Sequence, residues 1–331
     1  MQLCDLRTKI LNSSSPIIIS THQNPDGDAL GSEIALTYSL RKMGKEVILV
    51  NQDRTPGAFK FLEQYEKIKA IPEIVDLPKK ALVILVDVHD LDTTGPEMKK
   101  LIGSIQDKEI LFVNHHSPKY FESDCGYILF DYASSTGEII YRFIKDELNF
   151  ALDKAIAECI YTAIISDTRS FRYSKTTAYS HQIASELLEY GIQAEKIQLE
   201  VFGSNNLNQM HVLGITLQNT RLAESGKIAY TYIPFEAMTQ YSLSPNETKG
   251  FINHLLTIKG VEIAVLLRQD GKEQIKVSMR SKGNYHIYDL AEEYGGGGHK
   301  FAASFTSNMP AETLLRNIVE RLEKLTMETL N

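Results

Sequence analysis

The 331-residue chain lacks any apolar run of about eighteen residues, so it offers no segment long enough to span a membrane. Its start, MQLCDLRTKILNSSSP, has charges inside its only apolar stretch and does not resemble a secretory signal. Cysteine is scarce: Cys4, Cys125 and Cys159 are odd in number and widely scattered, which fits neither a disulfide framework nor a zinc site. These absences favour a protein of the reducing cytoplasm with no membrane partner.

The chain also lacks a block of basic residues, and its formal net charge is −7. A protein that grips long nucleic acid usually carries a basic stripe, because neutralising phosphates supplies most of the affinity. We therefore expect no long nucleic acid partner. If the substrate is a nucleotide, it should be short and held by metal ions and a few basic side chains.

The first half of the chain contains four short apolar segments separated by helical patterns. They are continuous rather than alternating, which is typical of a parallel sheet covered on both faces. The sequence thus predicts an α/β fold with a doubly wound, mainly parallel sheet. The predicted strands are residues 16–20, 46–50, 81–87 and 109–116.

The length of the chain suits two domains, each with its own core. A helix-rich stretch from about residue 135 to residue 190 completes the first domain, predicted at 1–190. Residues 191–225 are predicted to be a helical linker. Residues 226–331 are predicted to form a smaller α/β domain, with a β-hairpin at Gln269-Asp270-Gly271-Lys272, where Asp-Gly is a strong turn signal.

Imidazole and carboxylate side chains follow several of the apolar segments of the first domain. In an open parallel sheet, ligands bind outside the carboxyl ends of the strands. Residues that end or follow different segments should therefore converge on one crevice. The candidate metal ligands are His22, Asp26, Asp28, Asp87, His115 and Asp167.

Four carboxylates in one crevice would repel each other strongly unless cations neutralised them. Two divalent ions roughly 3.5–4 Å apart would do so and would form a hydrolytic clamp. Mixed imidazole and carboxylate ligands without thiolate favour manganese, with magnesium and cobalt as alternatives. A single Asp after a strand is usually a turn or helix cap, so the prediction depends on the conjunction of six residues.

The second domain contains a glycine run, Gly295 to Gly298, followed by His299. Glycines let main-chain N–H groups approach a phosphate closely, and a helix that began there would add a favourable dipole. Arg280 could bind a phosphate through two parallel hydrogen bonds. A glycine run alone is often only a flexible turn.

Five motifs in this order resemble those of the DHH/DHHA1 phosphoesterase family. They are THQNPDGDALGS, LVDVHD, VNHH, IISDTRSFRY and GGGGH. The chain is most similar to the small nanoRNase, pAp phosphatase and cyclic-dinucleotide phosphodiesterase members. The resemblance implies an N-terminal DHH domain that holds the metals, a linker, and a C-terminal DHHA1 domain that binds substrate, with the active site in the cleft between them. Members of this kind are often dimers, so a homodimer is also implied as an open alternative.

The resemblance also implies roles for individual residues. His116, next to the metal ligands, would contact the scissile phosphate or help protonate the leaving oxygen; a structural hydrogen bond is the alternative. One metal would take His22, Asp26 and Asp87, and the other Asp28, Asp87, His115 and Asp167. Substrate contacts would come from Arg280, Gly296, Gly297, Gly298 and His299.

The sequence departs from the family pattern at Asn114, where the family has Asp. Asn retains the size but lacks the negative charge. If this position orients a ligand histidine, the change should lower the basicity of that ligand and alter rate or metal preference. All six expected ligands remain, so we expect an active enzyme.

The leading expectation is therefore a two-metal phosphodiesterase that cleaves pApA-like dinucleotides and very short oligonucleotides to mononucleotides. One alternative is a phosphomonoesterase acting on 3′-phosphoadenosine 5′-phosphate (pAp). Another is a nucleotide-binding sensor that retains metals but turns over slowly. Pyrophosphate hydrolysis is less favoured.

Overall fold

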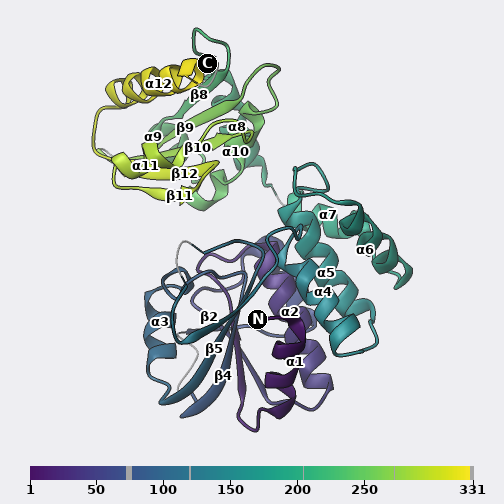
Figure 1. Ribbon diagram of the computed structural model, residues 1–331. Helices are drawn as coiled ribbons and strands as arrows, with labels where there is room; N and C mark the ends of the chain where they lie inside the picture. The colour runs from purple at the N-terminus through teal and green to yellow at the C-terminus, as the bar shows by residue number, and fades with distance from the viewer. Residues whose placement is uncertain (72–76, 119–120, 204, 272, 329–331) are drawn as a thin grey trace. The chain divides into compact units, whose positions relative to one another are not determined.

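A computed structural model describes residues 1–71, 77–118, 121–203, 205–271 and 273–328. The chain forms two compact units, Met1–Ser204 and Asn205–Asn331 (Figure 1). Each unit contains a six-stranded sheet, so the predicted pairing of a mainly parallel α/β region with a second α/β region is confirmed. Among the described residues, no helix combines the length and the apolarity that a membrane crossing needs.

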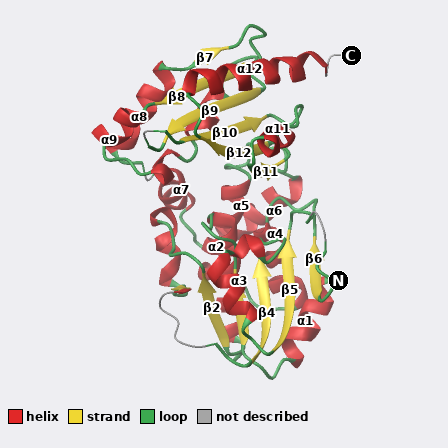
Figure 2. Ribbon diagram, turned by 90° about the vertical axis from the view of Figure 1, so that its left-hand side faces the viewer, coloured by secondary structure: helices red, strands yellow, loops and turns green. Residues whose placement is uncertain are grey.

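The sheet of the first unit is parallel throughout, in the order β3-β2-β1-β4-β5-β6. Figure 2 shows β4, β5 and β6 pointing the same way. Two strands were not predicted: β3 has only two residues, and β6 is an edge strand without a continuous buried run. The strands are β1 (Ile17–Ser20), β2 (Val47–Asn51), β3 (Lys69–Ala70), β4 (Lys80–Val86), β5 (Asp107–Asn114) and β6 (Cys125–Leu129).

Helices cover both faces of this sheet. Along β1, Ile17 and Ile19 pack into the core on one face, whereas Ile18 packs into the core on the other. The core that contains Ile18 also includes Met98 and Ile102 of α3. The core that contains Ile17 and Ile19 includes residues of several helices. Those helices are α1 (Leu3–Asn12), α2 (Gly27–Lys42), α4 (Thr136–Arg142), α5 (Lys154–Asp167), α6 (Ala178–Glu189) and α7 (Ala194–Phe202); α3 is Pro96–Gly103.

The strand order determines where a ligand can bind. The chain leaves β1 through α2 toward β2 on one side, and it leaves β4 through α3 toward β5 on the other side. The neighbouring strands β1 and β4 therefore form a topological switch point. In doubly wound sheets, the crevice outside the carboxyl ends of two such strands is the usual binding site.

The second unit has a mixed sheet in the order β11-β12-β10-β9-β8-β7, in which only the β8–β9 pairing is parallel. The predicted hairpin joins β9 and β10, but Gln269 pairs with Ile275, so its connection is longer than a tight turn. Lys272, part of that prediction, lies outside the described residues. The strands are β7 (Arg221–Leu222), β8 (Ile228–Ile233), β9 (Ile263–Gln269), β10 (Ile275–Ser281), β11 (Gly297–His299) and β12 (Ala302–Ser307). The helices are α8 (Leu207–Gln218), α9 (Phe235–Gln240), α10 (Phe251–Leu255), α11 (Tyr288–Glu293) and α12 (Ala311–Glu328).

Gly31 allows α2 to pack directly on α5, and these two helices carry Asp28 and Asp167. A Cβ atom at Gly31 would lie 2.3 Å from the carbonyl oxygen of Cys159, so the helices would have to separate. We expect Gly31→Ala to lower the free energy of unfolding by about 1–3 kcal/mol, measured by chemical denaturation. Gly103→Ala in α3 is the matched control, because its Cβ would meet no described atom within 4 Å. An equal loss of stability in both variants would contradict this packing argument.

Candidate metal centre

The loop after β1 supplies three of the predicted ligands. His22 lies two residues after the end of β1. Asp26 is the N-cap of α2, where Oδ1 accepts hydrogen bonds from the main-chain N–H groups of Asp28 (3.0 Å) and Ala29 (3.2 Å). Asp28 lies in the first turn of α2 and is fully buried. Capping therefore uses one oxygen of Asp26, and it places Asp26 and Asp28 at the start of the same helix.

Asp87 lies between two histidines from different segments. It follows β4 with a φ of 57°, a left-handed conformation that Asp tolerates better than most residues. Its Oδ2 atom is 3.6 Å from Nε2 of His22, and its Oδ1 atom is 3.7 Å from Nε2 of His115. The two oxygens of one carboxylate thus face two different imidazoles.

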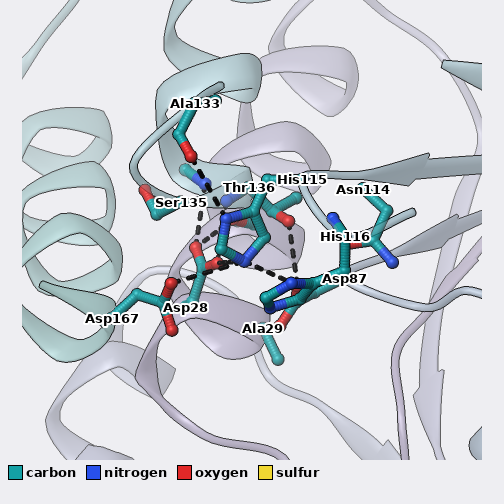
Figure 3. A network of polar contacts seen from close by, with 12 residues as sticks. Asp28, Ala29, Asp87, Asn114, His115, His116, Ala133, Ser135, Thr136 and Asp167 are labelled. Carbon is teal, nitrogen blue, oxygen red and sulfur yellow. Dashed lines mark hydrogen bonds and ion pairs between the residues drawn. The ribbon is translucent and has the colours of Figure 1, made fainter. Parts of the chain in front are cut away.

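The structure brings all six predicted ligands together at the switch point. Figure 3 shows Asp28, Asp87, His115 and Asp167 close together. Within each of three overlapping groups, the candidate ligand atoms lie within 4.8 Å of one another. Asp87 belongs to two of these groups, and His116 appears in the third. The groups are His22, Asp26 and Asp87; Asp28, Asp87 and His115; and His115, His116 and Asp167.

Both predicted histidine ligands direct Nε2 toward the carboxylates and Nδ1 toward a main-chain carbonyl. Nδ1 of His22 is 2.9 Å from the oxygen of Gln23, and Nδ1 of His115 is 3.4 Å from the oxygen of Ala133. Metal-binding histidines usually donate their second N–H to such a carbonyl, so both rings are oriented as metal ligands. The oxygen and imidazole donors with no thiolate suit hard or borderline divalent ions.

Thr136, which the sequence analysis missed, positions two of the carboxylates (Figure 3). The main-chain N–H groups of Thr136 and Gly137 donate to the Asp28 carboxylate at 2.7 and 2.8 Å. The Thr136 hydroxyl donates to Oδ1 of Asp87 at 2.9 Å. These groups belong to the first turn of α4, whose N-terminal amides favour an anion. The only sequence signal for this contact was the predicted helix start near Ser135.

Burial and mutual repulsion disfavour the ionised forms of carboxylates in this cluster. Burial, followed by the charges of Asp87 and Asp167, raises the pKa of Asp28 well above its ordinary value. Burial opposes the ionisation of Asp87, but its hydrogen bond with His22 lowers the pKa of Asp87. Burial would lower the pKa of His22, but Asp87 raises it to about 9. These shifts arise because negative charges are buried together with no cation between them, so the residues fit divalent metal ions.

Asp167 reaches the cluster from the last residue of α5, not from a strand end as we had expected for the ligand groups. The chain then reverses through Arg169, Ser170 and Phe171, with φ angles of 49°, 57° and 64°. Such left-handed residues persist only where contacts hold them, and here Oγ1 of Thr168 accepts a hydrogen bond from the N–H of Phe171 at 3.1 Å. The turn returns the chain toward the site.

Asn114 does not contact a ligand imidazole in the way that the sequence analysis considered. Its Oδ1 atom instead accepts a hydrogen bond from the main-chain N–H of His116 at 3.0 Å. Its Nδ2 atom is buried and has no hydrogen-bond partner among the described residues. An Asp oxygen could accept the same bond, so the Asn114 contact orients the backbone of His116 without needing a charge. The rings of His115 and His116 have centroids 3.9 Å apart.

The residues predicted to bind substrate lie in the second unit. Arg280 is half-buried in β10, and its guanidinium donates to the carbonyl oxygen of Met279 at 2.9 Å. Of His299, the structure describes only the main chain, in β11. The glycine run continues into β11, which pairs antiparallel with β12, so no helix begins there.

That pairing explains two glycines of the run. A Cβ at Gly296 would lie 2.3 Å from the oxygen of Ser304, and one at Gly298 would lie 2.4 Å from the oxygen of Ala302. A Cβ at Gly297 would meet no described atom within 4 Å. Close strand packing therefore requires Gly296 and Gly298, whereas Gly297 has room for a side chain.

Comparison with known protein families gives two matches. The sequence profile of the DHH family, N-terminal domain, matches residues 16–164. The profile of the DHHA1 domain matches residues 225–328. Together the two profiles cover most of the chain, and the first contains five of the six candidate ligands.

Similar proteins span almost the same length. The chain is 27% identical over 322 residues to the bifunctional oligoribonuclease and PAP phosphatase NrnA of Bacillus subtilis, covering 95% of this chain and 97% of that protein. It is 28% identical over 273 residues to a probable manganese-dependent inorganic pyrophosphatase of Streptococcus thermophilus, covering 81% and 79%. The crystal structure of an exopolyphosphatase-related protein from Bacteroides fragilis matches with a TM-score of 0.89 and 27% identity, covering 99% of this chain and 98% of that one.

A buried acid supports the strand end that carries His22, and the sequence analysis missed it. Oε1 of Glu33, in α2, accepts a hydrogen bond from Nδ2 of Asn51 at 2.7 Å, and Oδ1 of Asn51 accepts one from the main-chain N–H of Thr21 at 3.3 Å. Oε2 of Glu33 has no partner among the described residues. Burial raises the pKa of Glu33 from 4.5 to about 8.

This pKa predicts how stability depends on pH. Folded protein retains a proton on Glu33 that unfolded chain releases, so the stabilisation is complete below about pH 4.5 and is lost as pH rises to about 8. Glu33→Gln retains the acceptor for Asn51 and cannot ionise. We expect the unfolding free energy of Glu33→Gln to rise relative to that of wild type by up to about 1.4 kcal/mol for each pH unit between pH 5 and pH 8. The measurement is urea denaturation in the presence of a chelator. Glu97→Gln, exposed on α3, is the matched control, and a pH-independent gain in Glu33→Gln would refute the assignment.

Proposed function

The chain belongs to the DHH/DHHA1 family of phosphoesterases, and on this premise we propose that it is a metal-dependent phosphodiesterase that hydrolyses dinucleotides and very short oligonucleotides to mononucleotides. One observation carries the proposal: the Asp87 carboxylate directs one oxygen toward His22 and the other toward His115. A carboxylate in this position can be shared by two ions. Two-ion sites of this kind are typical of phosphoester hydrolysis.

We propose two divalent ions, with manganese as the metal. Manganese is supported by the imidazole and carboxylate donors and by the manganese-dependent relative in Streptococcus thermophilus. Such a pair, when bound, would activate a water molecule and neutralise charge on the phosphate. We assign one ion to His22, Asp26 and Asp87, and the other to Asp28, Asp87, His115 and Asp167.

The residues of the chain would supply orientation and proton transfer. Thr136 and Gly137 hold Asp28 and Asp87 at fixed positions through three hydrogen bonds, two from Thr136 and one from Gly137, so the carboxylates need not reorganise during the reaction. His116 would contact the scissile phosphate or protonate the leaving oxygen. We assign substrate contacts to Arg280, Gly296, Gly297, Gly298 and His299.

The proposed substrate is short for two reasons. The net charge of −7 does not favour a long polyanion, and the relative in Bacillus subtilis is named as an oligoribonuclease. The same name includes PAP phosphatase, which supports cleavage of a terminal phosphomonoester as a second candidate activity. Both reactions require the same site.

A comparison of substrates tests the proposal. The purified full chain with manganese should convert pApA to pA faster than it releases phosphate from pAp, and it should leave pyrophosphate essentially intact, as measured by ion-exchange chromatography. Asp87→Asn should lower the pApA rate by more than about 100-fold, because even supporting partners of a metal ligand contribute ~10–100-fold. Asn tolerates the left-handed backbone at this position.

Asp107→Asn is the matched control, since Asp107 is exposed at the opposite end of β5 and pairs with Lys80. Preferred hydrolysis of pyrophosphate would overturn the proposal. Tight dinucleotide binding without any mononucleotide product would instead establish the nucleotide-binding sensor.

His116→Ala tests whether this histidine acts on substrate or binds metal. If it transfers a proton, the variant should lose about 10²–10⁴-fold in kcat while it still binds two manganese ions per chain. Metal stoichiometry is measured by equilibrium dialysis and the rate with pApA. His254→Ala, an exposed position in α10, is the control. Loss of one manganese ion would show that His116 is a ligand, contrary to the assignment.

A further inference from the structure

A lysine contacts the candidate metal ligand His115 from the side opposite the carboxylates. Nζ of Lys175 lies 3.2 Å from Nδ1 of His115 and 3.3 Å from its carbonyl oxygen. Lys175 follows the left-handed turn at residues 169–171 and is only partly buried. A cation thus lies directly behind a residue that is proposed to bind another cation.

Nδ1 of His115 would have to act as a donor to one neighbour and as an acceptor from another. The carbonyl oxygen of Ala133, 3.4 Å from Nδ1 of His115, needs an N–H group there, whereas the Lys175 ammonium needs a lone pair. A neutral imidazole carries one hydrogen, on one of its two nitrogens. Nδ1 therefore satisfies either Ala133 or Lys175, but not both.

The position of the imidazole hydrogen determines whether Nε2 can bind a metal ion. With the hydrogen on Nδ1, the bond to Ala133 forms and Nε2 offers its lone pair to an ion. With the hydrogen on Nε2, Nδ1 accepts from Lys175, and the N–H group at Nε2 faces Oδ2 of Asp167 at 3.3 Å. The lysine contact therefore belongs to the tautomer that cannot bind metal.

We infer that Lys175 is a positioning residue that holds the His115 imidazole in its non-ligating tautomer and so weakens one of the two metal sites. The affected site is the one assigned to Asp28, Asp87, His115 and Asp167. The site assigned to His22, Asp26 and Asp87 contains no residue in contact with Lys175 among the described contacts, and it retains its affinity. This inference rests on the proposed two-metal function.

Charge acts in the same direction as the hydrogen bond. The ammonium group lies one imidazole ring away from the proposed ion, so the two cations repel each other. When an ion binds, Lys175 retains the carbonyl oxygen of His115 as an acceptor and gives up Nδ1. Exposed neighbours at residues 172–174 leave room for the ammonium to turn toward solvent, so its release has a low cost. One ion is thus held tightly, and occupancy of the other follows the metal concentration.

Metal binding by the full chain, without substrate, tests the inference. Manganese is titrated into metal-free protein by calorimetry, and the paired-ion signal is followed by electron paramagnetic resonance. In wild type we expect one tight and one weaker ion. Lys175→Met should tighten the weaker ion by about tenfold and leave the tight ion unchanged, so that the paired-ion signal appears at lower total manganese.

Two further variants separate charge from packing. Lys175→Arg retains the positive charge and the donors, and it should bind manganese like wild type. Lys154→Met, an exposed lysine at the start of α5, is the matched control and should change neither affinity. A purely structural role of Lys175 would instead loosen metal binding in Lys175→Met.

The results distinguish this inference from the proposed function. Unchanged or weaker binding of the second ion in Lys175→Met, in protein that still binds two ions and cleaves pApA as wild type, would overturn the inference alone. Equal tightening in Lys175→Arg would also overturn it, because charge and donor would then be irrelevant. Wild-type protein that binds no manganese pair would overturn the proposed function and this inference together.

Discussion

Repulsion among the carboxylates at the carboxyl ends of β1 and β4 is the constraint on which the first unit depends. Strand order brings Asp28 and Asp87 to one switch point, and burial of Asp28 prevents water from screening them. The protein offsets this repulsion with fixed dipoles and positive charge: the first amides of α4, the Thr136 hydroxyl and the imidazolium of His22. Direct packing of α2 on α5 through Gly31 prevents the carboxylates from moving apart. The crevice persists because the packing and the hydrogen bonds around it outweigh the repulsion among its carboxylates.

Backbone strain is concentrated where this crevice needs it. Asp87 has a left-handed backbone directly after β4, and the three residues from Arg169 to Phe171 have one after α5. Each such residue costs of order 1 kcal/mol and survives only where its surroundings determine its conformation. At Asp87 the N–H group still donates to the carbonyl of Val113 at 2.9 Å, so the strand pairing continues while the side chain turns toward the histidines. The left-handed backbone at these positions therefore directs functional side chains toward the crevice.

The parts of this molecule that could be predicted from sequence are those with a local signal. Continuous apolar runs gave β1, β4 and β5, and the polar residues that follow them gave His22, Asp87 and His115. Thr136 could not be found in this way, because its partner Asp28 lies 108 residues away and no local pattern links them. Lys175 has the same difficulty, since its partner His115 is 60 residues distant. The conformation of the glycine run also has no local signal, because it is determined by pairing with β12 and not by the run itself.

The two groups of ligands depend on the fold to different extents. His22 and Asp26 come from one short loop, Nδ1 of His22 contacts the carbonyl of the next residue, and only Asp87 is contributed from elsewhere. The group around His115 instead draws on β5, the end of β4, the start of α2, the end of α5 and the first turn of α4, and its carboxylate Asp28 is fully buried. An ion in the first group would need only the pairing of β1 and β4. An ion in the second group would require five elements in their final positions, so its binding free energy would be coupled to the folding of the whole unit. Local opening of α4 or α5 would thus release the second ion before the first.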